Sequence, residues 1–357
     1  MISNIRYIRF NQGVNTFYML SLKINELLDN YEIDLYDETD NPQGYQRPIQ
    51  KSHKRKIVEY LLKENEPILN IAILAAVNSN SIKDDSEFLE IEDKLKIVDG
   101  QHRLEAFREL RENYSGLFNS KFKNYEVPII LMRTNENKII EMETFVSINN
   151  KNKRVNTALA EHILEEIRKE KKPELYVSMK WSELAASERK EFINSLSHRV
   201  TKYLNEDSNS VWFKLIKTGD NNTQNRVISI NTFNNSLKPI IENYIDNYED
   251  EINPDKLCKD ILEMISYIWE SVKNKWEKAF NIKYYNLQKG IGVYTIHNVF
   301  AQSIKQEPDN FYQIFDRIIE ESKVDTEDWL IGGKFSPLNS KSGMKEIEKY
   351  ILNKEGF

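Results

Sequence analysis

The residues best suited to chemistry in this chain stand together in the stretch LKIVDGQHRLEA. An apolar run stops at Asp99 and Gly100, and Gln101, His102 and Arg103 follow before apolar residues resume at helical spacing. A strand that turns into a helix through a glycine exposes the first N–H groups of the helix, which favour phosphate. Histidine and arginine add donors, and an arginine can hold a phosphate through two parallel hydrogen bonds. Asp99 could bind a metal, orient His102 or cap the helix. The pattern predicts an anion site, against the alternative of an ordinary capped helix.

A second basic segment, GYQRPIQKSHKRK, lies upstream. Gln46 and Arg47 stand just before a helix that the apolar spacing predicts, with Ser52 as the expected N-cap. Cations crowd the start of this helix, namely Lys51, His53, Lys54, Arg55 and Lys56. Because cations at a helix N-terminus oppose the helix dipole, the cluster is unfavourable unless it meets an anion. The alternative is a solvated basic face.

A third candidate is the Asn- and Lys-rich stretch FVSINNKNKRVN, which ends a helix predicted over 135–148. We expect a polar loop there that can contact phosphates or base edges. Its candidate DNA-binding residues are Asn149, Lys151, Lys153 and Arg154.

Composition narrows the class of protein. A chain of 357 residues with 40% hydrophobic content predicts a folded protein with more than one domain, and a net charge of −6 neither demands nor excludes a nucleic-acid partner. The single cysteine, Cys258, excludes an intramolecular disulfide and a Cys-based zinc site. No G-x-x-x-x-G-K-[ST] occurs, so we do not expect a P-loop NTPase. The start lacks a signal peptide's apolar core and no apolar run is long enough to span a bilayer, so we expect a soluble, cytoplasmic protein.

The elements that must position these residues change character along the chain. The first part alternates short strands with helices, and its strands are predicted at about 69–77, 95–98 and 125–133. The acidic stretch 78–93 is predicted to be a surface loop. Amphipathic helices dominate the second part, at 231–247, 254–279 with Asn253 as cap, 292–306 and 309–322. We therefore expect an α/β domain over 1–172 and a mainly α-helical domain over 173–357.

IVDGQHRL (97–104) resembles the defining motif of the DGQHR-domain family, which includes the DNA phosphorothioation-associated DndB proteins. YQRP (45–48), FVSINNKNKRV (145–155) and SVWFKLI with RVISINTFNNSL (210–237) follow that family's order, so the resemblance covers most of the chain. The family is similar to the wider ParB/sulfiredoxin group, which implies a mixed sheet with helices and a nucleotide's phosphates on a glycine-led corner. Gly100 to Ala106 matches the G-x-x-R-x-x-A spacing of the ParB nucleotide-binding box. Where sulfiredoxin has a cysteine this chain has Gln101, so sulfinic-acid reduction is not expected.

The leading hypothesis is a nucleotide-binding component of a DNA-modification (phosphorothioation-type) or phage-defence system, taking ATP, CTP or GTP with Mg²⁺. The residues expected to hold phosphates are Gly100, His102, Arg103, Gln46 and Arg47. If the protein also hydrolyses the nucleotide, the candidate catalytic residues are Asp99, Gln101, His102 and Arg103. No residue of the corner is an unambiguous general base for hydrolysis.

Two alternatives stay open. One is a non-catalytic DNA-binding transcriptional regulator of the modification operon, with phosphate contacts from Lys51, Lys54, Arg55, Lys56 and the third candidate stretch. The other is a ParB-like nicking nuclease, which needs a metal and a carboxylate pair that the sequence does not identify. The expected partners are DNA and other modification or defence proteins, without a membrane, and a homo-oligomer is left open.

Overall fold

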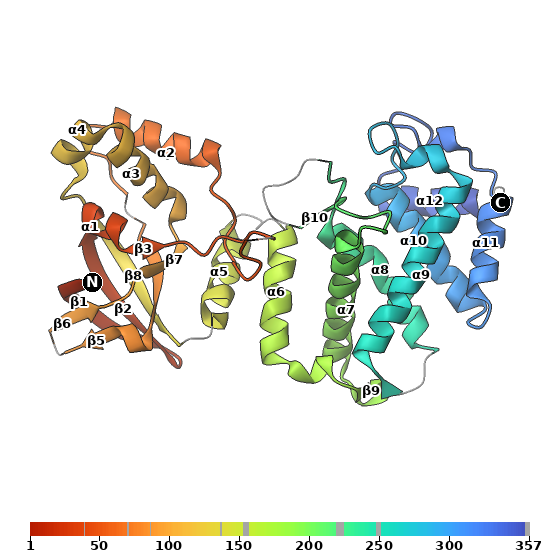
Figure 1. Ribbon diagram of the computed structural model, residues 1–357, viewed down its shortest axis with the longest axis horizontal. Coiled ribbons are helices and arrows are strands. Elements are labelled where there is room, and N and C mark those ends of the chain that lie inside the picture. Colours follow the sequence, from red (N-terminus) through yellow and green to blue (C-terminus); the bar gives the residue numbers. More distant parts are fainter. Residues whose placement is uncertain are drawn as a thin grey trace. The chain divides into compact units, whose positions relative to one another are not determined.

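The computed structural model describes residues 1–38, 40–69, 71–85, 87–135, 138–152, 157–218, 225–247 and 251–353, with the backbone alone at 150–152 and 157–158. It is a mixed α/β structure (Figure 1). Contacts divide the chain into two compact units, unit 1 (Met1–Asn156) and unit 2 (Thr157–Phe357). The predicted boundary after residue 172 would put α6 (Thr157–Lys171) in the first domain, whereas α6 packs on helices of unit 2.

Unit 1 combines strands with short helices. Its strands are β1 (Ile2–Gln12), β2 (Asn15–Lys23), β3 (Tyr31–Glu32), β4 (Ile73–Asn78), β5 (Ile82–Asp84), β6 (Phe88–Ile91), β7 (Leu95–Asp99) and β8 (Glu126–Thr134). Its helices are α1 (Ile24–Asp29), α2 (Lys51–Lys63), α3 (Gln101–Asn113), α4 (Ser115–Leu117) and α5 (Ile139–Asn152).

One mixed sheet contains the strands of unit 1, in the order β3-β7-β4-β8-β2-β1-β6-β5. β4 runs parallel to β8 and antiparallel to β7, which ends at the DGQHR motif. β5 and β6 continue the sheet beyond β1, so the prediction of a loop over 78–93 is wrong there. The reason is that Ile82, Leu89 and Ile91 are buried while the polar residues between them face out.

The central strands bury their two faces against different helices. Ile129 and Leu131 of β8 share one hydrophobic core with Leu61 of α2 and Phe107 of α3. Met132 points to the opposite face, where its sulfur accepts a hydrogen bond from Thr144 Oγ1 of α5 at 3.7 Å. The last residues of β7 therefore lie between a layer that contains α2 and α3 and a layer that contains α5.

The helix α5 begins and ends four residues later than the sequence predicted. It runs to Asn152, so 145–152 is helical and the expectation of a loop is wrong over those residues. Met142, Phe145 and Val146 are buried at helical spacing, so the beginning of the stretch 145–156 packs as part of a helix. Asn149 donates from Nδ2 to the carbonyl of Phe145 at 2.9 Å, one turn back.

The described part of unit 2 is built largely of helices. They are α6, α7 (Ala186–Glu206), α8 (Ile230–Ile245), α9 (Pro254–Lys275), α10 (Gly290–Gln306), α11 (Phe311–Glu321) and α12 (Lys341–Ile351). Short strands pair as β9 (Met179–Lys180) with β12 (Glu251–Ile252) and β10 (Ile216–Lys217) with β11 (Ile228–Ser229).

The core of unit 2 takes residues from the helical stripes that the sequence predicted. Asn253 Oδ1 accepts from the N–H groups of Asp255 and Lys256, both at 3.0 Å, which confirms the predicted cap of α9. Trp212 and Phe233, from the motif at 210–237, pack edge to face at 4.8 Å. Among the described residues no helix is long and apolar enough to cross a membrane.

Candidate functional site

The strand β7 turns into α3 through Gly100. Its φ of 109° and ψ of 4° belong to a conformation that side chains other than glycine rarely adopt. A Cβ there would lie 2.9 Å from Arg103 Nη2 and 3.2 Å from Ile73 Cγ1, so the Arg103 guanidinium would have to shift to admit it. No side chain caps α3 and no acid lies in its first turn, so the helix end keeps its positive polarity.

Arg103 is engaged by the protein itself. Its guanidinium donates to the carbonyl oxygens of Ile71 and Ala72, the latter at 3.2 Å, and to Asp99 Oδ2 at 3.3 Å. The side chain is 15% exposed; burial lowers its pKa and the Asp99 carboxylate opposes that shift. Arg103 thus joins the segment before β4 to the start of α3. To hold a phosphate, it would have to exchange these contacts for the ligand.

His102 points to a different partner, the start of α2. Its Nε2 accepts a hydrogen bond from the backbone N–H of Gln50 at 3.1 Å, and its ring lies 4.7 Å from that of His53. Burial, then the charges of His53 and Arg47, lower the pKa of His102 to about 4. The imidazole is therefore neutral at pH 7 and accepts at Nε2. The upstream Arg47 acts on His102, so the structure brings together these two predicted residues.

Two N-termini of helices meet at this hydrogen bond. The N-cap of α2 is Gln50, so the prediction of Ser52 is wrong, and the Gln50 N–H is the group that His102 accepts from. α2 has no side-chain cap and no acid in its first turn, like α3, and the two helices pack on each other. The positive ends of α2 and α3, Arg47 and His53 therefore converge beside His102. We call this group the helix-end site.

The two glutamines of the motifs are buried at this corner. Gln46 donates from Nε2 to the carbonyl of Ile97, and Gln101 is 6% exposed. The Oε1 atom of each is buried without a hydrogen-bond partner in the described part of the chain. Such an acceptor costs about 1–3 kcal/mol, which a donor from a ligand or a water would recover.

Some of the predicted DNA-binding side chains form ion pairs with described residues, and others are exposed on α2. Lys54 Nζ lies 2.7 Å from Glu109 of α3, and Arg55 pairs with Glu59 along α2 at 2.8 Å. Lys51 and Lys56 are exposed on α2. Of the third candidate stretch, Asn149 lies on α5; Lys153 and Arg154 fall outside the described residues, as does the side chain of Lys151.

A hollow of about 690 Å³ meets the corner on the side of Asp99. Phe10 and Phe17, cross-strand neighbours of β1 and β2, stack at 5.5 Å with 15° between their rings and form part of its wall. Among the described residues that line it, the charged ones are Asp99 and Glu143, both acidic. An occupant of this hollow should therefore offer hydrogen-bond donors and a flat apolar face, not a bare phosphate.

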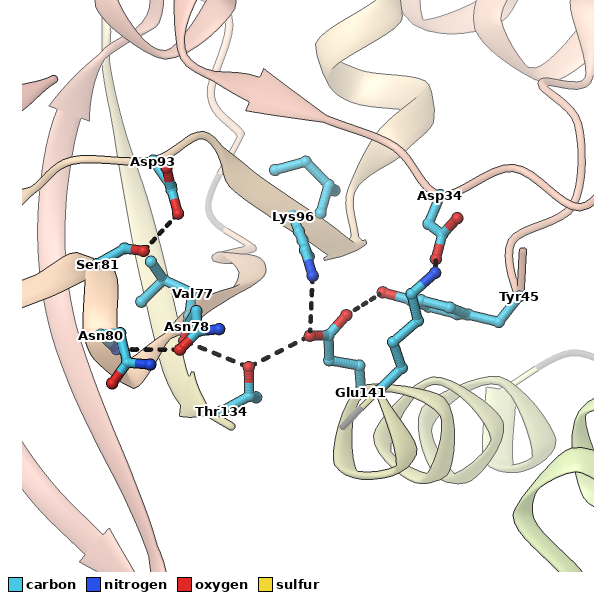
Figure 2. A network of polar contacts seen from close by, with 12 residues as sticks. Asp34, Tyr45, Val77, Asn78, Asn80, Ser81, Asp93, Lys96, Thr134 and Glu141 are labelled. Atoms are coloured by element: carbon cyan, nitrogen blue, oxygen red, sulfur yellow. Dashed lines mark hydrogen bonds and ion pairs between the residues drawn. The ribbon is translucent and has the colours of Figure 1, made fainter. Parts of the chain in front are cut away.

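Unit 1 also contains a buried carboxylate that the sequence did not predict, Glu141 of α5, which is 1% exposed (Figure 2). It accepts from Tyr45 Oη and Thr134 Oγ1, both at 3.2 Å, and Lys96 Nζ of β7 lies 3.9 Å away. Burial raises the pKa of Glu141, and Lys96 opposes that shift. No local pattern marks this residue, because two of its partners, Tyr45 and Lys96, come from distant segments of the chain.

The described residues hold no group of three or more His, Cys, Asp or Glu placed to bind a metal ion. At the corner Asp99 is 43% exposed and paired with Arg103. Mg²⁺ commonly uses one or two carboxylates together with substrate phosphates, so Asp99 fits as a single protein ligand to an ion that arrives with a nucleotide.

The comparison with protein families covers both units. The family model of DndB, described as DNA-sulfur modification-associated, matches residues 5–321 of the 357. No curated protein and no solved structure matches the chain. The match includes the helix-end site, the hollow and the motif at 210–237, and the chain belongs to the DndB family of DNA-sulfur modification-associated proteins.

Proposed function

We propose that this protein is the nucleotide-binding component of a DNA-sulfur modification system and that it holds nucleotide phosphates at the helix-end site. The observation that carries the proposal is the convergence of two uncapped helix N-termini, α2 and α3, beside Arg47, His53 and His102. Backbone N–H groups at helix ends and an arginine fork are the groups that proteins use for phosphates. The family supplies the biological setting.

The hollow beside Asp99 suits the nucleoside half of a ligand. Phe10 and Phe17 offer an aromatic surface, and Asp99 and Glu143 can accept from base N–H or ribose hydroxyl groups. Its acidic lining would repel a polyphosphate unless Mg²⁺ came with it. The charges thus favour phosphates at the helix-end site and donors in the hollow.

Binding can be tested by substituting Arg47, which is half-buried and makes no hydrogen bond or ion pair with another described residue. Arg47→Ala should weaken binding of ATP, CTP or GTP with Mg²⁺ about tenfold or more, since a charge-assisted hydrogen bond is worth roughly 1.5–3 kcal/mol. The matched control is Arg9→Ala, which removes an exposed arginine paired with Asp84 at 3.1 Å. Arg103→Ala is a poorer test because it also frees the Ile71 and Ala72 carbonyls.

Titration of full-length protein by calorimetry, with phosphate release followed in the same samples, measures binding and hydrolysis separately. If no nucleoside triphosphate binds, or if Arg47→Ala and Arg9→Ala bind alike, the proposal is wrong.

A DNA-binding regulator is the second candidate, and the exposed cations of α2 favour it. Each phosphate contact made by Lys51 or Lys56 contributes about 0.9 to the slope of log affinity against log salt concentration. The double variant Lys51→Gln/Lys56→Gln should therefore reduce that slope by roughly two on the promoter of the modification operon, whereas Lys23→Gln on β2 should not. Equal slopes for the three proteins would remove α2 from the DNA interface.

A further inference from the structure

Unit 2 contains a polar pocket of about 360 Å³ that the proposed function does not use. α6 and α7, which run beside each other in Figure 1, form most of it, with the 3₁₀ turn Pro173–Tyr176 and the start of α9. Its lining includes His162, Glu165 and Lys169 of α6 and His198, Arg199 and Lys202 of α7.

Glu165 lines this pocket, and its carboxylate oxygens already accept hydrogen bonds from neighbouring side chains. It is 1% exposed and accepts hydrogen bonds from Ser195 Oγ at 2.7 Å, from Tyr176 Oη at 2.9 Å and from the Arg168 guanidinium. Because its charge is matched by Arg168 and its oxygens are occupied, Glu165 has little capacity left for a ligand.

His198 is different, because one of its ring nitrogens lacks a partner. The residue is 4% exposed, and its Nδ1 is buried with no hydrogen-bond partner in the part of the chain that the structure describes. Its ring lies 6.3 Å from that of His162, with 35° between the ring planes. An orphaned buried polar atom is costly, so a partner for Nδ1 is expected to come from the pocket.

The charges that act on this nitrogen are positive. Burial first, then His162, Lys169, Lys202 and Arg168, lower the pKa of His198 to about 3. The largest charges that act on the imidazole are therefore those of cations, although four carboxylates also line the pocket. A neutral imidazole beside these cations can donate from Nδ1–H to an anion.

The carboxylates at the rim are engaged with cations of the same region. Glu166 pairs with Lys169 at 2.7 Å and Glu206 with Lys202 at 3.9 Å, each along its own helix. Asp255 pairs with Arg199. Lys169 and Lys202 are 47% and 50% exposed, and exposed pairs of this kind are weak, so both ammonium groups can turn toward an anion in the pocket.

We propose that this pocket binds a small phosphate-bearing ligand, with His198 Nδ1–H donating to a phosphate oxygen and Lys169 and Lys202 closing on it from the rim. The volume lies at the lower end of the range for small-molecule sites, about 300–1,000 Å³, which suits one phosphate group or a compact ester of it. The two histidines do not form a metal site with a third ligand among the described residues. The site lies within unit 2 and is independent of the helix-end site.

The test uses the full chain with inorganic phosphate and, separately, AMP as probes. Histidine side-chain NMR should show saturable binding that shifts His198 Nδ1. Lys169→Gln and Lys202→Gln should each weaken it about tenfold, the loss of one charge-assisted contact. Lys305→Gln changes an exposed lysine of α10 that does not line the pocket; it is the matched control and should bind like wild type. Arg47→Ala should also bind phosphate normally, which separates this pocket from the helix-end site.

The two probes distinguish the source of the phosphate. Tighter binding of AMP than of inorganic phosphate identifies an ester, and equal binding identifies the free anion; both support the site. Absence of saturable binding overturns the proposal, as does binding that Arg47→Ala abolishes while Lys202→Gln does not. A short DNA duplex that displaces phosphate in a Lys202-dependent manner would overturn a small-molecule site in favour of a backbone contact.

Discussion

Substituting Gly100 by alanine tests whether the corner is held by conformation and by Arg103 together. The positive φ of 109° costs an L-residue about 1–3 kcal/mol. The new Cβ would lie 2.9 Å from Arg103 Nη2, an atom that donates to Ala72 and Asp99, and moving it weakens charge-assisted hydrogen bonds by about 1 kcal/mol. We expect Gly100→Ala to lower the stability of unit 1 by about 2–4 kcal/mol.

Gly13→Ala is the matched control for this experiment. Gly13 also has a positive φ, 59°, but a Cβ there would meet nothing within 4 Å, so the variant carries the conformational cost alone, about 1–2 kcal/mol. The difference between the two variants therefore contains the contacts of the new Cβ with Arg103 and Ile73, together with any difference in backbone cost between the two φ values.

The assay must separate the two units, because a chain with two compact units need not unfold in one step. All five tryptophans lie in unit 2, so tryptophan fluorescence reports the unfolding of that unit and should not change. Native-state hydrogen exchange at the amides of β4 and β7 gives the opening free energy of unit 1. If Gly100→Ala exchanges like wild type within about 0.5 kcal/mol, or if Gly13→Ala loses as much, the account of the corner is wrong.

The remaining predictions concern the same unit. Since the pKa of His102 falls from 6.5 unfolded to about 4 folded, unit 1 should lose stability as the pH falls from about 6.5 to 4, and NMR titration of the Arg47→Ala variant should show a higher pKa for His102. Burial raises the pKa of the Glu141 carboxyl above 4.5, so its contribution to the stability of unit 1 is greatest below the unfolded pKa and is lost as the pH rises through the folded pKa. Hydrogen exchange should show that Glu141→Gln abolishes this dependence on pH. Arg103→Lys should lower the opening free energy at the amides of β4 by about 1–3 kcal/mol and so speed their hydrogen exchange, because one ammonium cannot bond to two carbonyls and Asp99 as the guanidinium does. Unchanged exchange would contradict the role of Arg103 in joining the segment before β4 to α3.

Local pattern was sufficient for several features of this protein. The strand–Gly100–helix corner, the Asn253 cap and the helical stripes of unit 2 depend on residues close in sequence, so spacing and residue type predicted them. The family could also be recognised from motifs in the correct order, and the match over 5–321 confirmed it. The bounds of some elements differed from the prediction. α5 continues to Asn152, and β5 and β6 form at the edge of the sheet within the acidic stretch 78–93.

The partners of each polar side chain were decided by the tertiary structure. The sequence placed His102 and Arg103 side by side and suggested one shared task, but successive residues of a helix point about 100° apart. His102 therefore meets the N-terminus of α2, whereas Arg103 clamps the segment before β4. The carboxylate of Glu141 and the unpartnered nitrogen of His198 were likewise invisible in sequence, because burial and hydrogen bonding depend on segments that only folding brings together.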